Sequence, residues 1–170
     1  MRILGLAVVL AAAALLLTQH TYSNSRHYEQ CRYLYTDNEI QELLNGEGIS
    51  IDHDEELNQY PGPNQVLAAA DELGLSREQV QKITAINEQM RRDAVSLGRA
   101  IMDQEKELEQ LISTGASTDA ANLMVREVAE KHQKLHDIHL AAHVQVKSQL
   151  TPEQLEEYHR LHAHQTAHTH

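Results

Sequence analysis

Residues 131–151, KHQKLHDIHLAAHVQVKSQLT, are the stretch from which we predict the fold. Four histidines here are spaced by four, three and four residues, which places them in one stripe of an α-helix. We call this stripe the histidine row; it consists of His132, His136, His139 and His143. The apolar side of the same helix lies roughly 70° around the axis from the row. The row is therefore expected to flank the buried face and need not fill it.

The composition of the chain favours packed helices. Its 170 residues correspond to about one domain. Aromatic residues make up 4%, and none is Phe or Trp, so the core must be built from aliphatic side chains, which suits helices better than a β-sandwich. The net charge of −11 argues against nucleic-acid binding, because phosphate contacts need clustered Lys and Arg.

Two long amphipathic helices are predicted, one on each side of a short turn. Ser76 and Gln79 form a capping box that starts the first, which continues to about Ile112. Ser117 or Thr118 caps the second, which carries the histidine row to about residue 149. Helices of similar length joined by a short turn form an antiparallel hairpin. We therefore predict an all-α fold, a long antiparallel helical hairpin with shorter flanking helices.

Two shorter helices are predicted before the hairpin. Asp37 or Asn38 can cap a helix that ends at Gly46. Pro63 suits the first position of the next helix, which should stop at Gly74. Both helices are expected to flank the hairpin.

The chain divides into four parts. Residues 1–25 carry one positive charge at Arg2, followed by a long apolar run, which predicts a signal peptide or an uncleaved membrane anchor. Residues 26–60 are expected to form a tether with a short helix and an acidic loop, residues 61–162 the helical domain, and residues 163–170 a His-rich tail. Cys31 is the only cysteine, so it either has no role or bridges two chains.

One sequence device occurs twice, at the two ends of the hairpin. Leu75-Ser76-x-x-Gln79 precedes it, and Leu150-Thr151-x-x-Gln154 follows it, with Pro152 at the first position of a last helix. Behind an export signal, these two copies resemble the LTxxQ-motif family of bacterial periplasmic proteins. The resemblance covers residues 60–161, so the helical domain is expected to be of the LTxxQ type.

The family includes Spy and CpxP-type chaperones and stress adaptors, and CnrX and ZraP-type heavy-metal sensors. The resemblance implies a Spy/CpxP-like bent hairpin, commonly a homodimer, located in the periplasm. Ser76 stands where the motif usually has Thr, a change that keeps the capping chemistry. The CnrX-type ligand pattern includes His-x-x-x-Met, whereas this helix has His-x-x-x-His, so that ligand set does not carry over.

The first functional hypothesis is a periplasmic sensor or buffer of divalent transition metals. Imidazole suits Zn, Ni, Co and Cu, and imidazoles one helical turn apart can share an ion. The predicted ligands are His132, His136, His139 and His143, with the tail histidines as a second, flexible set. The structural alternative for the row is a polar helix shoulder facing water. A pH sensor built from the row is a variant of this hypothesis.

The alternative function is a Spy/CpxP-type ATP-independent chaperone or signalling adaptor, although Spy-type cradles are usually basic and this chain is acidic. Its partners would be unfolded clients or a membrane-bound signalling protein. An enzyme is not expected, because the sequence has no nucleophile motif, phosphate loop or HExxH. No organic cofactor is expected. The protein is expected to contact the membrane only through residues 1–25, if they are not cleaved off.

Overall fold

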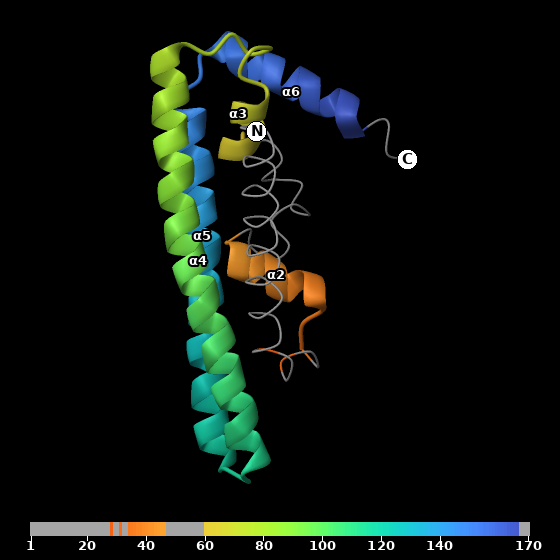
Figure 1. The fold of residues 1–170 in the computed structure, drawn as a ribbon, viewed down its shortest axis with the longest axis vertical. Helices are drawn as coiled ribbons and strands as arrows, with labels where there is room; N and C mark the ends of the chain where they lie inside the picture. Colours follow the sequence, from red (N-terminus) through yellow and green to blue (C-terminus); the bar gives the residue numbers. More distant parts are fainter. Residues whose placement is uncertain (1–27, 29–30, 32–33, 47–59, 167–170) are drawn as a thin grey trace, which may run out of the picture.

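The computed structural model describes Tyr28, Cys31, residues 34–46 and residues 60–166 (Figure 1). Regular structure in these parts is entirely helical and consists of α2 (Asp37–Asn45), α3 (Pro63–Ala68), α4 (Arg77–Ser113), α5 (Thr118–Lys147) and α6 (Pro152–Thr166). The predicted all-α class with a long helix pair is confirmed. None of the described helices is long and apolar enough to cross a membrane. The predicted signal or anchor, residues 1–25, lies outside the described residues.

Helices α4 and α5 form the antiparallel hairpin and run side by side in Figure 1. With 37 residues, α4 is roughly 55 Å long at 1.5 Å per residue. The hydroxyl of Ser117 accepts a hydrogen bond from the backbone N–H of Ala120 and starts α5. In the turn, Gly115 has φ of +76°, a left-handed conformation that glycine adopts without steric cost. The hairpin ends therefore agree closely with the prediction.

The two LTxxQ copies both form the predicted capping boxes. The Oε1 of Gln79 accepts from the backbone N–H of Ser76 at 2.9 Å, and the Ser76 hydroxyl accepts from the Gln79 N–H at 3.2 Å. Thr151 and Gln154 repeat both bonds at 3.0 and 3.2 Å. Each box satisfies N–H groups that a helix start leaves without intrahelical partners.

The two motif glutamines also bind each other, and we call them the glutamine pair. The Nε2 of Gln79 donates to the Oε1 of Gln154 at 2.7 Å and to the carbonyl oxygen of Gln149 at 2.8 Å. The Nε2 of Gln154 donates in return toward the carbonyl oxygens of Leu73 and Gly74 at 3.3 and 3.4 Å. Each side chain thus caps its own helix through its oxygen and bonds the other motif through its nitrogen. Glutamate could form the capping box but lacks this amide donor.

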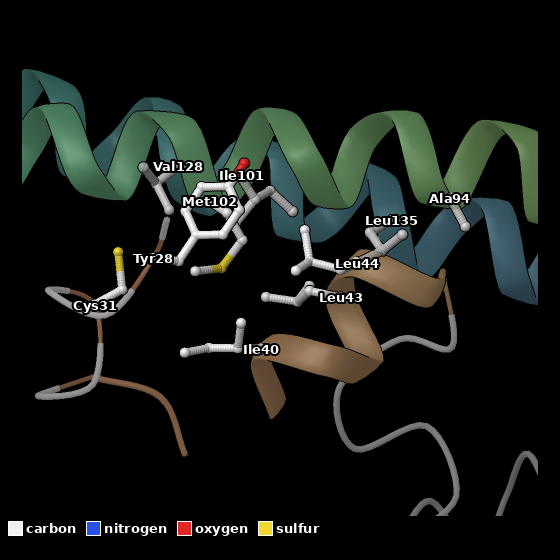
Figure 2. Packing of buried hydrophobic residues seen from close by; sticks show 10 residues of the cluster. All are labelled: Tyr28, Cys31, Ile40, Leu43, Leu44, Ala94, Ile101, Met102, Val128 and Leu135. Atoms are coloured by element: carbon white, nitrogen blue, oxygen red, sulfur yellow. The ribbon is translucent and has the colours of Figure 1, made fainter. Parts of the chain in front are cut away.

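Helix α2 packs across the hairpin, and Figure 2 shows its apolar side chains facing α4 and α5. The buried cluster there consists of Tyr28, Cys31, Ile40, Leu43, Leu44, Ala94, Ile101, Met102, Val128 and Leu135. Fully burying one aliphatic side chain contributes about 1.5–3 kcal/mol. Tyr28 and Cys31 belong to the stretch predicted as a tether, but the structure places both side chains in the core.

Gly98 allows α2 to lie directly on α4. A Cβ atom built on Gly98 would be 2.0 Å from the carbonyl oxygen of Leu43, far inside van der Waals contact. Helix α2 then ends at Gly46, whose φ is +73°. The backbone of α2 can therefore approach the hairpin this closely only where α4 has no side chain.

A second buried cluster closes the open end of the hairpin. It consists of Val66, Leu73, Ile83, Val146 and Tyr158. These residues come from α3 and the turns after it, from both hairpin helices and from α6, so the cluster joins the flanking helices to the hairpin.

Three boundaries differ from the prediction. Helix α2 is capped by Thr36 and not by Asp37 or Asn38, because Glu39 completes a capping box with Thr36. Helix α3 ends at Ala68, well before Gly74.

Residues 69–74 continue instead as hydrogen-bonded turns. These turns bring the carbonyl oxygen of Leu73 within reach of the Gln154 amide. Helix α6 runs to Thr166, into the predicted tail of residues 163–170, since no Gly or Pro interrupts it.

We predict that Gln154→Glu lowers the free energy of unfolding by about 2 kcal/mol. The variant keeps the capping box but loses two cross-motif donations worth about 1 kcal/mol each. Gln81→Glu is the matched control, because Gln81 is exposed on α4 and the charge change is the same. Urea denaturation followed by circular dichroism measures both, and equal stabilities would contradict the role given to the glutamine pair.

We predict that Gly98→Ala releases α2 from the hairpin, although Ala is the better helix former by about 1 kcal/mol. Overpacking typically costs 1–3 kcal/mol, and 1.4 kcal/mol corresponds to about a tenfold change in an equilibrium. Labelling of the buried Cys31 by a thiol reagent should therefore accelerate about tenfold. Ser96→Ala, at an exposed position of the same helix, is the control, and its Cys31 should be labelled at the rate of the parent chain. If Cys31 in Gly98→Ala is labelled no faster than in the parent chain, the close contact at Gly98 is unimportant for attachment of α2.

Candidate functional site

The histidine row faces the described residues that precede α3. We call these residues the amino-terminal segment; they are Tyr28, Cys31, residues 34–46 and residues 60–62. His132, His136 and His143 are half-buried, whereas His139 is only 4% exposed. The row therefore flanks the buried face at three positions, as predicted, but His139 is part of that face. Gly46, at the end of α2, lies against His139 on this shoulder of α5. The apolar pattern of α5 alone therefore does not reveal how much of the helix is buried.

His139 joins α5 to the end of α2. Its Nδ1 lies 2.8 Å from the carbonyl oxygen of Leu135, and its Nε2 lies 3.0 Å from the carbonyl oxygen of Gly46. Carbonyl oxygens only accept, and a neutral imidazole carries one N–H. Neutral His139 can therefore donate to one of the two carbonyls, and only its protonated form can donate to both. In this arrangement neither nitrogen is directed at an open coordination position.

His132 contacts the amino-terminal segment through Tyr35. The two rings stack with centroids 6.2 Å apart, and the His132 Nε2 lies 3.0 Å from the Tyr35 hydroxyl oxygen. The same hydroxyl donates to the Oε1 of Glu105 at 2.7 Å. Burial lowers the pKa of His132, and the charge of Glu105 opposes this shift. Burial, followed by the hydrogen bond to Glu105, raises the pKa of Tyr35.

His143 contacts the same segment further along the helix. Its Nδ1 lies 3.0 Å from the carbonyl oxygen of Tyr60, and the Lys147 ammonium lies 4.3 Å from the centre of the Tyr60 ring. A cavity of about 330 Å³ opens beside it, with Gly46, Arg91 and His139 also in its wall. Three of the four imidazoles thus bind the amino-terminal segment.

His136 differs from the rest of the row. Within the described residues it makes no hydrogen bond, ion pair or ring contact, although it is half-buried. In the same part of the chain, no three His, Cys, Asp or Glu side chains are grouped so that they could hold a metal ion. The four-histidine ligand set remains a prediction, and His139 would have to give up a hydrogen bond to join it. The acidic loop and the last tail histidines lie outside the described residues.

Sequence reasoning missed Tyr35 and Glu105. Glu105 is 5% exposed, and its Oε2 has no hydrogen-bond partner in the described part of the chain. The one available signal was its position on the apolar side of α4, where a carboxylate is unusual. Tyr35 stood in the predicted tether and carried no signal.

Cys31 is a free, buried thiol. Burial raises its pKa to about 11, with Glu105 and Glu109 adding to the shift. Because the thiolate is the reactive form, reaction at neutral pH requires the amino-terminal segment to open. A disulfide between two chains remains a prediction, and it would require the same opening.

We predict that His139→Leu weakens attachment of the amino-terminal segment, since the Gly46 carbonyl loses its partner. An unmade buried hydrogen bond costs about 1–3 kcal/mol, so Cys31 labelling should accelerate about tenfold or more. His136→Leu is the matched control within the row. Equal labelling rates for the two variants would contradict the role of His139 as a clamp.

The comparisons with known proteins agree with the fold. The sequence profile described as LTXXQ motif family protein matches residues 64–162, which is more than half of the 170 residues. Comparison with curated proteins and with solved structures gave no match. The matched range contains the glutamine pair, the whole hairpin and the histidine row. The chain therefore belongs to the LTXXQ motif family.

Proposed function

We propose that the protein is a periplasmic sensor or buffer of divalent transition metals, in which metal binding at the histidine row is coupled to attachment of the amino-terminal segment. The LTXXQ family is generally periplasmic. The observation that carries the proposal is that His132, His139 and His143 each contact this segment. A ligand taken up by the row therefore acts on groups that also hold the segment.

The chemistry of the row suits borderline metal ions. Neutral imidazole binds Zn, Ni, Co and Cu better than it binds hard cations, and the chain carries a formal charge of −11, which favours approach of cations. His132 and His136 are one turn apart on α5 and half-buried. Two histidines at this spacing are a recurrent metal-binding pair on helices.

The coupling makes the protein a sensor and not only a buffer. A metal that binds the form with the segment attached stabilises that form, and attachment raises the affinity by the same factor. The segment follows residues 1–25, which the sequence predicts to be a signal peptide or membrane anchor. If the anchor is retained, a membrane-bound partner next to it would detect whether the segment is attached.

We predict saturable Zn²⁺ binding, micromolar or tighter, in a full-length chain in which the five histidines after α5 are replaced by glutamine. These are His159, His162, His164, His168 and His170. His132→Ala combined with His136→Ala should weaken Zn²⁺ binding at least tenfold, since two ligands are lost. Gln133→Ala combined with Lys134→Ala, at exposed positions between them, is the control. Isothermal titration calorimetry measures all three, and unchanged affinity in the histidine double variant would remove the row as the metal site.

A chaperone or stress adaptor is the second candidate, favoured by apolar residues near the hairpin turn. Ile112, Leu123 and Val125 are 56%, 60% and 50% exposed, as expected of a surface that holds unfolded clients. On this alternative, Ile112→Asn with Leu123→Asn would abolish suppression of client aggregation. Two results together would favour the chaperone. The parent chain would bind no metal, and it would suppress aggregation whereas the double variant would not.

A further inference from the structure

Resting on the proposed function, we propose that Tyr35 and Glu105 are positioning residues that hold the proton of His132 on Nε2 and leave Nδ1 to coordinate a divalent transition metal together with His136. The row then contains two kinds of histidine. His132 and His136 are the ligands, whereas His139 and His143 attach the amino-terminal segment.

The protons can be counted along the chain of hydrogen bonds. The Tyr35 hydroxyl has one proton and donates it to Glu105 at 2.7 Å. This bond uses the one hydroxyl proton, so the tyrosine has none left to donate to the imidazole. The His132 Nε2 lies 3.0 Å from the same hydroxyl oxygen and must therefore be the donor. A neutral imidazole has one N–H, so Nδ1 carries a lone pair.

The surroundings favour donation from His132 to Tyr35 and from Tyr35 to Glu105. Glu105 is 5% exposed, and Tyr35 makes the only hydrogen bond to its carboxylate that the described residues provide. Loss of the bond from Tyr35 would leave this buried carboxyl oxygen without a donor, which is costly. The stacking of Tyr35 on His132, with 23° between the ring planes, sets the orientation of the imidazole. Metal-binding histidines commonly have this kind of support from an acceptor behind the ring.

The remaining contacts separate ligands from clamps. In the described part of the chain, neither the His132 Nδ1 nor the His136 ring has a hydrogen-bond partner. His139 and His143 instead direct Nδ1 at the carbonyl oxygens of Leu135 and Tyr60. The proposed site therefore uses two imidazole nitrogens from the row, and water would supply the remaining ligands.

The first test determines the proton position in the full-length parent chain. Long-range proton–nitrogen correlation spectra of ¹⁵N-histidine-labelled protein identify which ring nitrogen of His132 is protonated. We expect the proton on Nε2 without metal, and a change centred on Nδ1 when Zn²⁺ is added. A proton on Nδ1 of His132 would overturn the proposal, whatever the metal affinity.

The second test uses variants with a matched control. Glu105→Leu leaves the Tyr35 hydroxyl free to donate its proton to the His132 Nε2. Tyr35→Phe removes the hydroxyl that supports the His132 ring. Each variant should weaken Zn²⁺ binding about 10–100-fold. Tyr28→Phe removes a similar bond, from Tyr28 to Asp103 at 2.8 Å, and should leave the affinity unchanged. Circular dichroism checks that each variant folds. If Glu105→Leu does not fold, the proton–nitrogen correlation spectrum of the parent chain still tests where the His132 proton lies.

The outcomes separate this inference from the proposed function. Unchanged affinity in Tyr35→Phe and Glu105→Leu, together with lost binding in His132→Ala, would overturn the positioning role and leave the metal-binding function standing. Absence of saturable Zn²⁺ binding in the parent chain would overturn both.

Discussion

The exchange of amide hydrogen bonds between Gln79 and Gln154 is the interaction on which the rest of the structure depends. It joins the start of α4 to the start of α6 and, through Gln149, to the chain just after α5. Because α4 and α5 are long, fixing their open ends also fixes which residues face each other further along. That register places Glu105 on α4 near His132 on α5, with Tyr35 between them.

A second constraint is the close approach of α2 to the hairpin at Gly98. The missing side chain lets the α2 backbone reach α4, and its apolar residues then complete the core shown in Figure 2. The end of α2 is brought to His139 as a result. Attachment therefore combines apolar burial with imidazole contacts, and on the proposed function these contacts are what a metal bound by the row would act on.

The hairpin could be predicted because its signals are local. Apolar periodicity and the capping residues Ser76 and Thr151 define helix starts from neighbouring residues alone. The site could be predicted only in part, because its contacts join distant residues: Tyr35 and His132 are 97 positions apart. Helix propensity alone disfavours Gly98 in α4, and only the backbone of Leu43, which lies against it, explains the glycine. The burial of His139 likewise depends on α2, which its own helix does not reveal.

On the proposed function, metal binding and attachment of the amino-terminal segment are one equilibrium. Hydrogen–deuterium exchange of the α2 amides in the full-length chain, with and without saturating Zn²⁺, tests it most directly. We expect Zn²⁺ to slow exchange in α2 and to leave α6 unchanged, because the metal would bind the form in which Tyr35 supports His132. If saturating Zn²⁺ leaves α2 exchange unaltered, or accelerates it, binding and attachment are not coupled in this way.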